Sequence, residues 1–373
     1  MSSTRSATEW VEGLSPWPAE GFGLDRIRAL LAELGEPQRR YPAVHVVGTN
    51  GKSTTARMTE ALLADAGLAV GTYLSPHVRG WSERIRVRGE EADFERAIDA
   101  VRARAERVGA TQFEVLTAAA LNAFAATDVD VAVVEAGLGG RHDATNVLDA
   151  RVVVLTNVAL DHMDVLGDSR EAIAGEKLAV VGPGAVVVLA EPEWEPLARE
   201  NGAVRVDLTA RSNLALAIAA AEAFLGRPVE PHAAESVRLP GRLERRGERP
   251  LEIWDGAHNI AGVGYLLPRL PDRKYVVVCS ILRDKRPELL LEALSVLGET
   301  LLATSSSNAR AMAAEELAAL ARPFFRRVEA VEDPAVARAL ALELAGGDGA
   351  VVVTGSLYLL AELHARSEDS HGR

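Results

Sequence analysis

The sequence predicts an α/β protein whose two domains are each built on a parallel sheet. Three observations lead to this prediction. The chain has 373 residues, which is too long for one typical core. Segments with helical periodicity separate short apolar runs. These runs are rich in Val, Ile and Leu, as parallel strands buried on both faces require. The runs occupy residues 43–48, 130–137, 151–158, 185–190, 251–256, 274–280, 300–305 and 350–355.

The first helix and the domain boundary follow from local signals. Met58, Leu62 and Leu63 share one face of a helix expected over residues 53–66, and a glycine follows this segment. The stretch "ESVRLPGRLERRGERP", residues 235–250, interrupts the apolar rhythm with proline, glycine and arginines. We therefore expect a larger domain over residues 1–240 and a smaller one over residues 241–373.

Composition excludes several classes of protein. The chain is 48% apolar and 25% charged, as ordinary globular proteins are. No apolar run reaches the ~18 residues that span a bilayer, and the N-terminus lacks a signal-peptide core. One cysteine, Cys279, rules out an internal disulfide framework and suits a reducing compartment. The net charge of −12 argues against nucleic acid as a partner. We expect a cytoplasmic protein without membrane or nucleic-acid partners.

The stretch "VVGTNGKSTT", residues 46–55, lies between a predicted strand and a predicted helix. Backbone N–H groups of a glycine-rich turn at a helix N-terminus form a site for phosphate. Lys52 can reach the outer phosphates, and Ser53 or Thr54 can ligate Mg²⁺. The full pattern G-x-x-x-x-G-K-[ST] would need glycine where Val46 stands. The strand-to-helix position nevertheless favours phosphate binding over an ordinary loop.

Polar side chains follow three further strands. In open α/β sheets, ligands collect at the carboxyl ends of strands. An oxygen of Ser75, the carboxylate of Glu135 and a nitrogen of His162 could therefore hold a divalent cation together. Each residue alone also has a plain structural interpretation, as a loop cap or a hydrogen-bonding partner. The set of three favours a metal site.

Eight motifs follow one another along the chain. They are "HVVGTNGKSTT", "YLSPHV", "FEVLTAAAL", "EAGLGGRHDATN", "TNVALDHMDVLG", "LPGRLE", "DGAHN" and "TGSLYLLAE". Taken together, they resemble the dihydrofolate synthase/folylpolyglutamate synthase family of the Mur ligase superfamily. The resemblance covers about residues 20–365 and implies a P-loop parallel-sheet ATPase domain followed by a smaller Rossmann-like α/β domain. The glycine loop and "FEVLT" point to the folate branch.

The resemblance implies an ATP-dependent amide ligase. The substrate carboxylate would attack the γ-phosphate of ATP, and the amino group of L-glutamate would then displace phosphate from the acyl phosphate. The acceptor would be dihydropteroate or the glutamate tail of a reduced folate. ATP and Mg²⁺ would be needed to neutralise the transferring phosphoryl group. Closure between two domains would exclude water. We expect a monomer whose partners are small molecules.

The resemblance also implies site residues in four roles. The ATP-binding residues would be Asn50, Gly51, Lys52, Ser53, Thr54, Asn213, Arg242 and Asp255. The metal ligands would be Ser75, Glu135, His162 and Lys177. The pterin substrate would lie against Gly21, Phe22, Gly23, Leu24, Thr111, Gln112, Phe113, Glu114, His142, Asp143 and Ala144. The catalytic residues would be Lys52, Lys177, His162, Asp255 and His258, with Asn259 as a neighbour.

Lys177 has a special role in this resemblance. The resemblance implies that this lysine is carbamylated, which means that CO₂ converts its amine to an anion. A carbamate offers two oxygens to a hard cation such as Mg²⁺. Composition alone would favour a lysine on a helix surface.

The chain also departs from the family pattern. Ser53 stands where the folate branch usually has glycine, as in several cell-wall ligases, so either Ser53 or Thr54 could meet Mg²⁺. His142 replaces the usual leucine of the glycine loop, and the segment between Lys177 and Asn213 is short. These changes bear on the pterin pocket and on the contacts to the nucleotide base.

Two other functions compete with this prediction. A cell-wall ligase of the same superfamily would act on a UDP-linked peptide, but "FEVLT" and "GLGGRHDATN" are features of the folate branch. A P-loop switch or motor would hydrolyse nucleotide to change partners. No guanine-reading Asn-Lys-x-Asp follows the P-loop, and a second α/β domain favours ligation. Formation of ADP that depends on both a pterin acid and glutamate separates the three.

Overall fold

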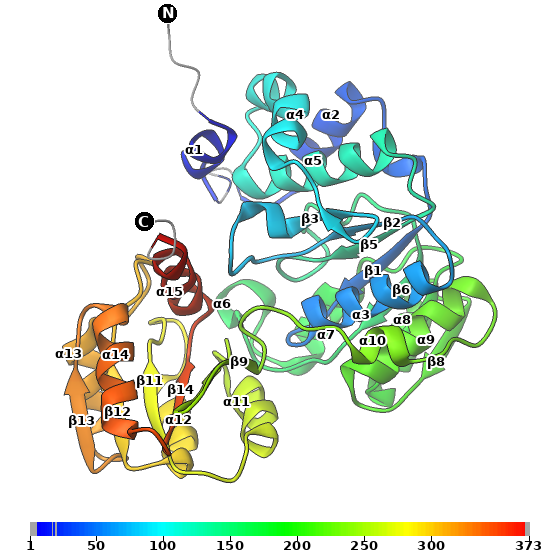
Figure 1. Ribbon diagram of the computed structural model, residues 1–373. Coiled ribbons are helices and arrows are strands. Elements are labelled where there is room, and N and C mark those ends of the chain that lie inside the picture. Colours follow the sequence, from blue (N-terminus) through cyan, green and yellow to red (C-terminus); the bar gives the residue numbers. More distant parts are fainter. Residues whose placement is uncertain (1–5, 17, 19–20, 370–373) are drawn as a thin grey trace, which may run out of the picture. The chain divides into compact units, whose positions relative to one another are not determined.

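The computed structural model describes residues 6–16, 18 and 21–369, and it divides into two compact units (Figure 1). The first unit comprises the chain up to His77 together with Trp81–Val237, and the second comprises Val78–Gly80 and the chain from Arg238. The three-residue segment Val78–Gly80 therefore packs with residues that follow it by more than 150 positions, which the order of the motifs does not predict.

The first unit contains an eight-stranded sheet in the order β4-β3-β2-β5-β1-β6-β7-β8. The strands from β2 to β8 in this order are parallel, and β3 and β4 are antiparallel additions at one edge. All residues of the central strands β1 and β5 are buried, as their continuous apolar runs predict. The strands are β1 (Ala43–Val47), β2 (Val70–Tyr73), β3 (Ile85–Val87), β4 (Glu90–Glu91), β5 (Val131–Glu135), β6 (Ala150–Leu155), β7 (Val186–Leu189) and β8 (Arg205–Leu208).

Helices cover both faces of this sheet. Because successive residues of a strand point to opposite faces, Val44 and Val46 pack in one core with α3 and α9, while Ala43 packs in another with α4 and α5. The helices are α1 (Ala7–Glu12), α2 (Asp25–Glu33), α3 (Lys52–Asp65), α4 (Phe94–Val108), α5 (Gln112–Ala126), α6 (Met163–Leu166), α7 (Arg170–Leu178), α8 (Glu195–Glu200), α9 (Asn213–Leu225) and α10 (His232–Glu235).

The second unit contains a six-stranded sheet in the order β13-β12-β11-β14-β10-β9. Its strands are parallel except for β9, which pairs antiparallel with β10 at the edge. The strands are β9 (Glu244–Glu248), β10 (Leu251–Trp254), β11 (Tyr275–Cys279), β12 (Thr300–Ala303), β13 (Arg327–Ala330) and β14 (Ala350–Thr354). The helices are α11 (Ile260–Leu266), α12 (Pro287–Leu294), α13 (Ala314–Ala321), α14 (Pro334–Ala345) and α15 (Leu357–Asp369).

This architecture confirms the predicted fold class, two α/β units with sheets that are mainly parallel. Short 3₁₀ turns complete the connections at Pro37–Arg39, Trp81–Arg84, Pro192–Trp194, Leu267–Arg269 and Ser295–Leu297. None of the helices in the described part of the chain is both long and apolar enough to cross a membrane.

Candidate active site

The loop between β1 and α3 can form only with glycine at two positions. Gly48 and Gly51 have φ angles of +145° and +82°. A Cβ atom at Gly48 would overlap the hydroxyl of Thr156, and one at Gly51 would overlap the amide oxygen of Asn213. The two glycines therefore let the loop lie directly against the segment after β6 and against the first residue of α9. The predicted nucleotide residue Asn213 is thus a neighbour of the loop.

Two residues after β6 hold the loop backbone in place. The Thr156 hydroxyl and the side-chain amide of Asn157 donate to the carbonyl of Asn50 at 2.7 and 2.9 Å. The Asn50 amide donates in return to Asn157 Oδ1 at 3.1 Å. Sequence reasoning missed both residues, although they begin the motif "TNVALDHMDVLG". These three hydrogen bonds fix the backbone of the loop at Asn50.

The first turn of α3 presents the groups that suit phosphate. Helix α3 begins at Lys52 and runs for 14 residues, so its positive dipole end and its unbonded N–H groups meet at the loop. The Lys52 ammonium donates to the carbonyl of Thr49 at 3.4 Å. This bond is long enough to be exchanged for a stronger one to a phosphate oxygen.

Glu135, the last residue of β5, is hydrogen-bonded both to α3 and to the segment after β2. One of its carboxylate oxygens accepts a hydrogen bond from the Ser53 hydroxyl at 2.9 Å, and the other accepts one from the Ser75 amide at 3.0 Å. Its side chain is buried, with 1% of the residue exposed. The structure therefore brings together Ser53, Ser75 and Glu135, and it records this contact for Ser53 rather than for Thr54.

The third predicted metal ligand, His162, lies at the start of α6 with a φ of +51°. Its amide donates to Asp161 Oδ1 at 3.0 Å, and its ring Nε2 lies 4.0 Å from the same oxygen. In the described part of the chain, no group of three or more His, Cys, Asp or Glu side chains could hold a metal ion. A cation at this site would need hydroxyl and phosphate oxygens besides Glu135. Mg²⁺ accepts such an oxygen set.

Lys177, near the end of α7, is buried against the loop. Its ammonium donates to the carbonyl of Gly48 at 2.9 Å, and only 4% of the residue is exposed. Burial, together with the nearby charge of Lys52, lowers the pKa of Lys177 to about 7, against the opposing charges of Asp161 and Asp143. The alternative of a lysine on a helix surface is therefore wrong.

The glycine loop after β5 is organised by Asp143. Its carboxylate accepts hydrogen bonds from the amides of Leu138 at 2.8 Å and Thr145 at 3.0 Å. Burial raises the pKa of this carboxyl group, and the hydrogen bonds oppose the rise. Ala144 is buried beside it, whereas His142 is exposed. Of the three predicted pterin residues in this loop, His142 is thus the one that a ligand can reach most directly.

A histidine that sequence reasoning missed supports the same loop. His45, in β1, is fully buried, and its Nε2 lies 2.8 Å from the Thr145 hydroxyl. That hydroxyl donates to Asp143 at 2.5 Å. Burial lowers the pKa of His45 to about 4, so the ring is neutral at pH 7. His45 looks like a member of the apolar run that contains it, and no local signal reveals this role.

The segment "TQFE" begins α5 and contacts both α2 and the glycine loop after β5. Thr111 and Glu114 cap the helix, since the Thr111 amide donates to the Glu114 carboxylate at 2.8 Å. Arg26 of α2 donates to the same carboxylate at 3.2 Å, which ties Gly21–Leu24, the residues before α2, to this helix start. The Phe113 ring packs against Gly137.

Gln112 and Phe22, two further members of the predicted pterin-binding set, differ in how accessible their side chains are to a ligand. The Gln112 side chain donates to the carbonyl of Val11 at 2.9 Å and so has a structural partner. Phe22 is 47% exposed, which is unusual for a side chain of this size. Phe22 is therefore a better candidate for ligand contact than Gln112.

The predicted residues of the second unit gather after β10. Asp255 accepts hydrogen bonds from the amides of Leu243 and Ala257, each at 2.9 Å. Burial raises its pKa, and the charge of Arg242 opposes the rise. The His258 ring nitrogen Nδ1 lies 2.9 Å from the carbonyl of Gly256. Asn259 caps α11. The structure thus brings Arg242, Asp255 and His258 to one strand end.

The fold and the loop define the class of this protein: it is a Mur ligase. Residues 46–205 match the Mur ligase middle domain, and residues 241–357 match the Mur ligase glutamate ligase domain. The dihydrofolate synthase/folylpolyglutamate synthase of Mycobacterium tuberculosis is 34% identical over 81% of this chain and 78% of its own length. The chain belongs to the dihydrofolate synthase/folylpolyglutamate synthase family, as its motifs predict, and it is a ligase.

Solved structures agree over almost the whole chain. The Escherichia coli enzyme in complex with DHPP and ADP is 30% identical, with a TM-score of 0.89 over 99% of both chains. The bifunctional folylpolyglutamate synthase/dihydrofolate synthase of Yersinia pestis, complexed with AMPPNP and a Mn ion, is 29% identical, with a TM-score of 0.87 over 98% of both chains. These similarities support the folate branch over the cell-wall ligases and the nucleotide switches.

Proposed function

We propose that this protein is an ATP-dependent carboxylate–amine ligase that adds L-glutamate to dihydropteroate, to the glutamate tail of reduced folates, or to both. The observation that carries the proposal is the position of Glu135. Its carboxylate accepts hydrogen bonds from the Ser53 hydroxyl, at the phosphate loop, and from the Ser75 amide. The buried Lys177 ammonium donates to the carbonyl of Gly48 in the same phosphate loop. Family membership supports the same activity.

The reaction needs a carboxylate to attack phosphorus. An oxygen of the substrate carboxylate forms a bond to the γ-phosphorus of ATP, and the bond to the β-phosphate oxygen breaks to release ADP. The backbone N–H groups of residues 50–54 and the Lys52 ammonium bind the phosphates and offset their charge. Asn213, which lies against Gly51, contacts the nucleotide in this proposal. Arg242 and Asp255 of the second unit also take part in nucleotide binding.

The second step forms the amide. The ammonium group of L-glutamate loses a proton to solvent, and the neutral amine attacks the carbonyl carbon of the acyl phosphate. The C–O bond to phosphate breaks, phosphate leaves, and the nitrogen loses a second proton to solvent to give the amide. An acyl phosphate hydrolyses readily, so the site must hold the amine close and exclude water. We assign His258, at the end of β10, to the neighbourhood of this step.

The residues around Glu135 fit Mg²⁺ because they supply oxygen donors. Ser53 and Glu135 would hold the cation together with phosphate oxygens, and His162 and Ser75 would complete the set. A bound Mg²⁺ would neutralise charge on the phosphates and orient the γ-phosphoryl group. The hydrogen bond from Ser53 to Glu135 favours Ser53 over Thr54 as the hydroxyl ligand.

Lys177 is proposed to be carbamylated. The neutral amine forms a bond to the carbon of CO₂ and releases one proton, which leaves an anionic carbamate. A buried lysine with a pKa of about 7 is largely neutral at pH 8, so it is a better nucleophile than a surface lysine. The carbamate would place an anion next to Lys52, which supplies a favourable charge partner.

The pterin-bearing substrate is proposed to lie against the glycine loop and the start of α5. Phe22 and His142 expose their side chains there, and Phe113 packs against Gly137. The imidazole of His142 can donate or accept a hydrogen bond, which leucine cannot do. We also propose that the enzyme is cytoplasmic and acts as a monomer on small-molecule substrates.

The test is ADP formation with each substrate omitted in turn. We expect ADP only when ATP, L-glutamate and a pterin acid are all present. We then measure competition between dihydropteroate and tetrahydrofolate as acceptors, and we expect His142→Leu to change their relative kcat/KM. ADP formation with tetrahydrofolate as the acceptor, but not with dihydropteroate, would leave only the activity that extends the glutamate tail. The variant Lys52→Ala, whose fold circular dichroism can check, should lose turnover, and near-normal turnover would refute the phosphate site.

A further inference from the structure

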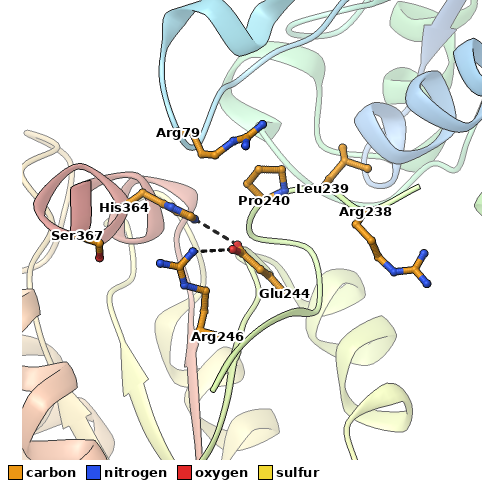
Figure 2. Close-up of a pocket in the computed structure, with 8 residues that line it drawn as sticks. All are labelled: Arg79, Arg238, Leu239, Pro240, Glu244, Arg246, His364 and Ser367. Atoms are coloured by element: carbon orange, nitrogen blue, oxygen red, sulfur yellow. Dashed lines mark hydrogen bonds and ion pairs between the residues drawn. The ribbon is translucent and has the colours of Figure 1, made fainter. Parts of the chain in front are cut away.

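The second unit carries a cavity of about 540 Å³ whose lining residues do not include Arg242 or Asp255 (Figure 2). Three arginines line it: Arg79, which belongs to this unit, Arg238 and Arg246. In a chain with a net charge of −12, three guanidinium groups around one cavity are a strong local reversal of charge. The cavity is therefore a candidate site for an anion.

The carboxylate of Glu244 also lines the cavity. This carboxylate already accepts hydrogen bonds from other groups of the protein. One oxygen accepts from Arg246 at 3.0 Å, and the other accepts from the Gly241 amide at 2.7 Å and from His364 Nε2 at 3.2 Å. Figure 2 shows Arg246 and His364 pointing toward Glu244 from two sides. The lining of the cavity thus contains three arginines and one carboxylate.

Arg246 is oriented by its neighbours. Its guanidinium lies 4.6 Å from the centre of the Trp254 ring, and Trp254 is fully buried. A guanidinium carries five N–H donors, and the hydrogen bond to Glu244 uses one of them. A group held in this way loses little freedom when it binds a carboxylate or phosphate.

The cavity also has an apolar part. Leu239, which is buried, and Pro240 lie among the basic side chains, and Figure 2 shows Arg79 on the other side of Pro240 from Glu244. A compact phosphate would use the arginines and leave this apolar surface uncovered. A chain in which carboxylates alternate with methylene groups would use both.

We propose that this cavity binds a small oligocarboxylate, of which a γ-linked chain of glutamates is the example that the proposed function supplies. The inference rests on that function for the choice of ligand. Binding here would hold the glutamate tail of a long folate on the second unit. It would strengthen the binding of long-tailed acceptors without changing the chemistry of the first glutamate addition.

Direct binding of γ-linked triglutamate, measured by titration calorimetry without ATP or pterin, tests the inference. We expect Arg79→Gln and Arg246→Gln each to weaken binding by about tenfold, the loss expected for one hydrogen bond between charged groups. Arg326→Gln is the matched control, because Arg326 is an arginine of the same unit whose side chain is 83% exposed. It should bind as the wild type does.

Three outcomes would overturn the inference. These are equal binding by the wild type and both variants, tighter binding of pyrophosphate than of triglutamate, and no measurable binding of triglutamate by the wild type. Arg246→Gln removes a side chain that packs on Trp254, and this variant could therefore unfold. Arg79→Gln, at an exposed position, keeps the test valid in that case.

Turnover separates this inference from the proposed function. The variants should keep the wild-type kcat/KM for dihydropteroate and raise the KM for a triglutamylated folate. Absence of ADP formation with every acceptor would refute the proposed function, and triglutamate binding would still report on the cavity. Normal ligation with an unchanged KM for the long acceptor would refute the cavity alone.

Discussion

The Ser53 hydroxyl donates a 2.9 Å hydrogen bond to the carboxylate of Glu135, which lies 82 residues further along the chain. This bond joins the first turn of α3 to the end of β5. The second oxygen of the same carboxylate accepts from the Ser75 amide. A single buried side chain thus fixes the positions of two segments of the chain. Substitution of either hydrogen-bonding partner should therefore change the affinity of the site for a cation.

The first prediction compares two neighbouring hydroxyls. Ser53→Ala should raise the Mg²⁺ concentration needed for half-maximal ADP formation by about tenfold, because it removes a proposed ligand and a partner of Glu135. Thr54→Ala, one residue away, should change it much less. A Mg²⁺ titration of both variants checks this, and a larger effect for Thr54→Ala would reverse the assignment.

The second prediction concerns the shape of the phosphate loop. Gly48→Ala should abolish measurable ATP binding, because the new Cβ atom would overlap the Thr156 hydroxyl. Gly226→Ala is the control, since Gly226 has a φ of +70° but no atom near its Cβ position. It should cost only about 1–2 kcal/mol of the free energy of unfolding. Nucleotide titration and thermal unfolding of both variants supply the data, and normal ATP binding by Gly48→Ala would contradict the loop geometry.

The third prediction concerns Lys177. Lys177→Ala should lose activity, and short carboxylic acids such as acetate should restore part of it by replacing the missing anion. Lys274→Ala, at an exposed lysine, should remain active and should not respond to acetate. Because the pKa of Lys177 is about 7, carbamylation should increase as the pH rises from 6 to 8 at fixed dissolved CO₂. A bare amine in a crystal grown at ordinary CO₂, together with an active alanine variant, would eliminate the carbamate.

The fourth prediction links Glu244 to stability at low pH. Burial alone would raise its pKa, but hydrogen bonds from His364, Gly241 and Arg246 outweigh burial and lower the pKa to about 2. Because the folded pKa is below the ordinary value of 4.5, the stabilisation is present above pH 4.5 and is lost as the pH falls toward 2. Partial exposure of the side chain reduces the effect to about 1–2 kcal/mol.

Denaturant unfolding of Glu244→Gln at several pH values measures this contribution. The variant should be less stable than the wild type at pH 7, and the difference should shrink between pH 4.5 and pH 2. Glu248→Gln, on the same strand with a side chain that is 73% exposed, should show no such trend. A difference that stays constant across this range would mean that the charge of Glu244 is not responsible.

The strands that the sequence predicts are those buried on both faces. All eight apolar runs contain strands, because Val, Ile and Leu satisfy both sides of a parallel sheet. Edge strands such as β9, with the sequence "ERRGE", and β13, with "RVEA", carry many charges and were not predicted. Their backbone pairing depends on a neighbouring strand that is distant in sequence, so local composition does not reveal it.

The same limit applies to the site. Motifs identify Lys52 and Glu135, because the chemistry of phosphate and metal restricts the residue types at strand ends. The supporting residues are different. Asn157 holds the loop through the backbone of Asn50, and His45 acts through Thr145, a hundred positions away. Such pairs exist only after folding has brought the strands together, and neither residue type signals its partner.

The short segment Val78–Gly80 has a consequence for any attempt to divide the protein. Because it belongs with the second unit, the backbone passes between the units three times, after His77, Gly80 and Val237. A fragment that begins at Arg238 would lack Val78, which is buried in one core cluster with Trp254 and lies near Gly241. Proteolysis at the single late boundary would therefore yield two incomplete pieces. Reassembly of the cut halves should succeed where solitary expression of the C-terminal piece fails.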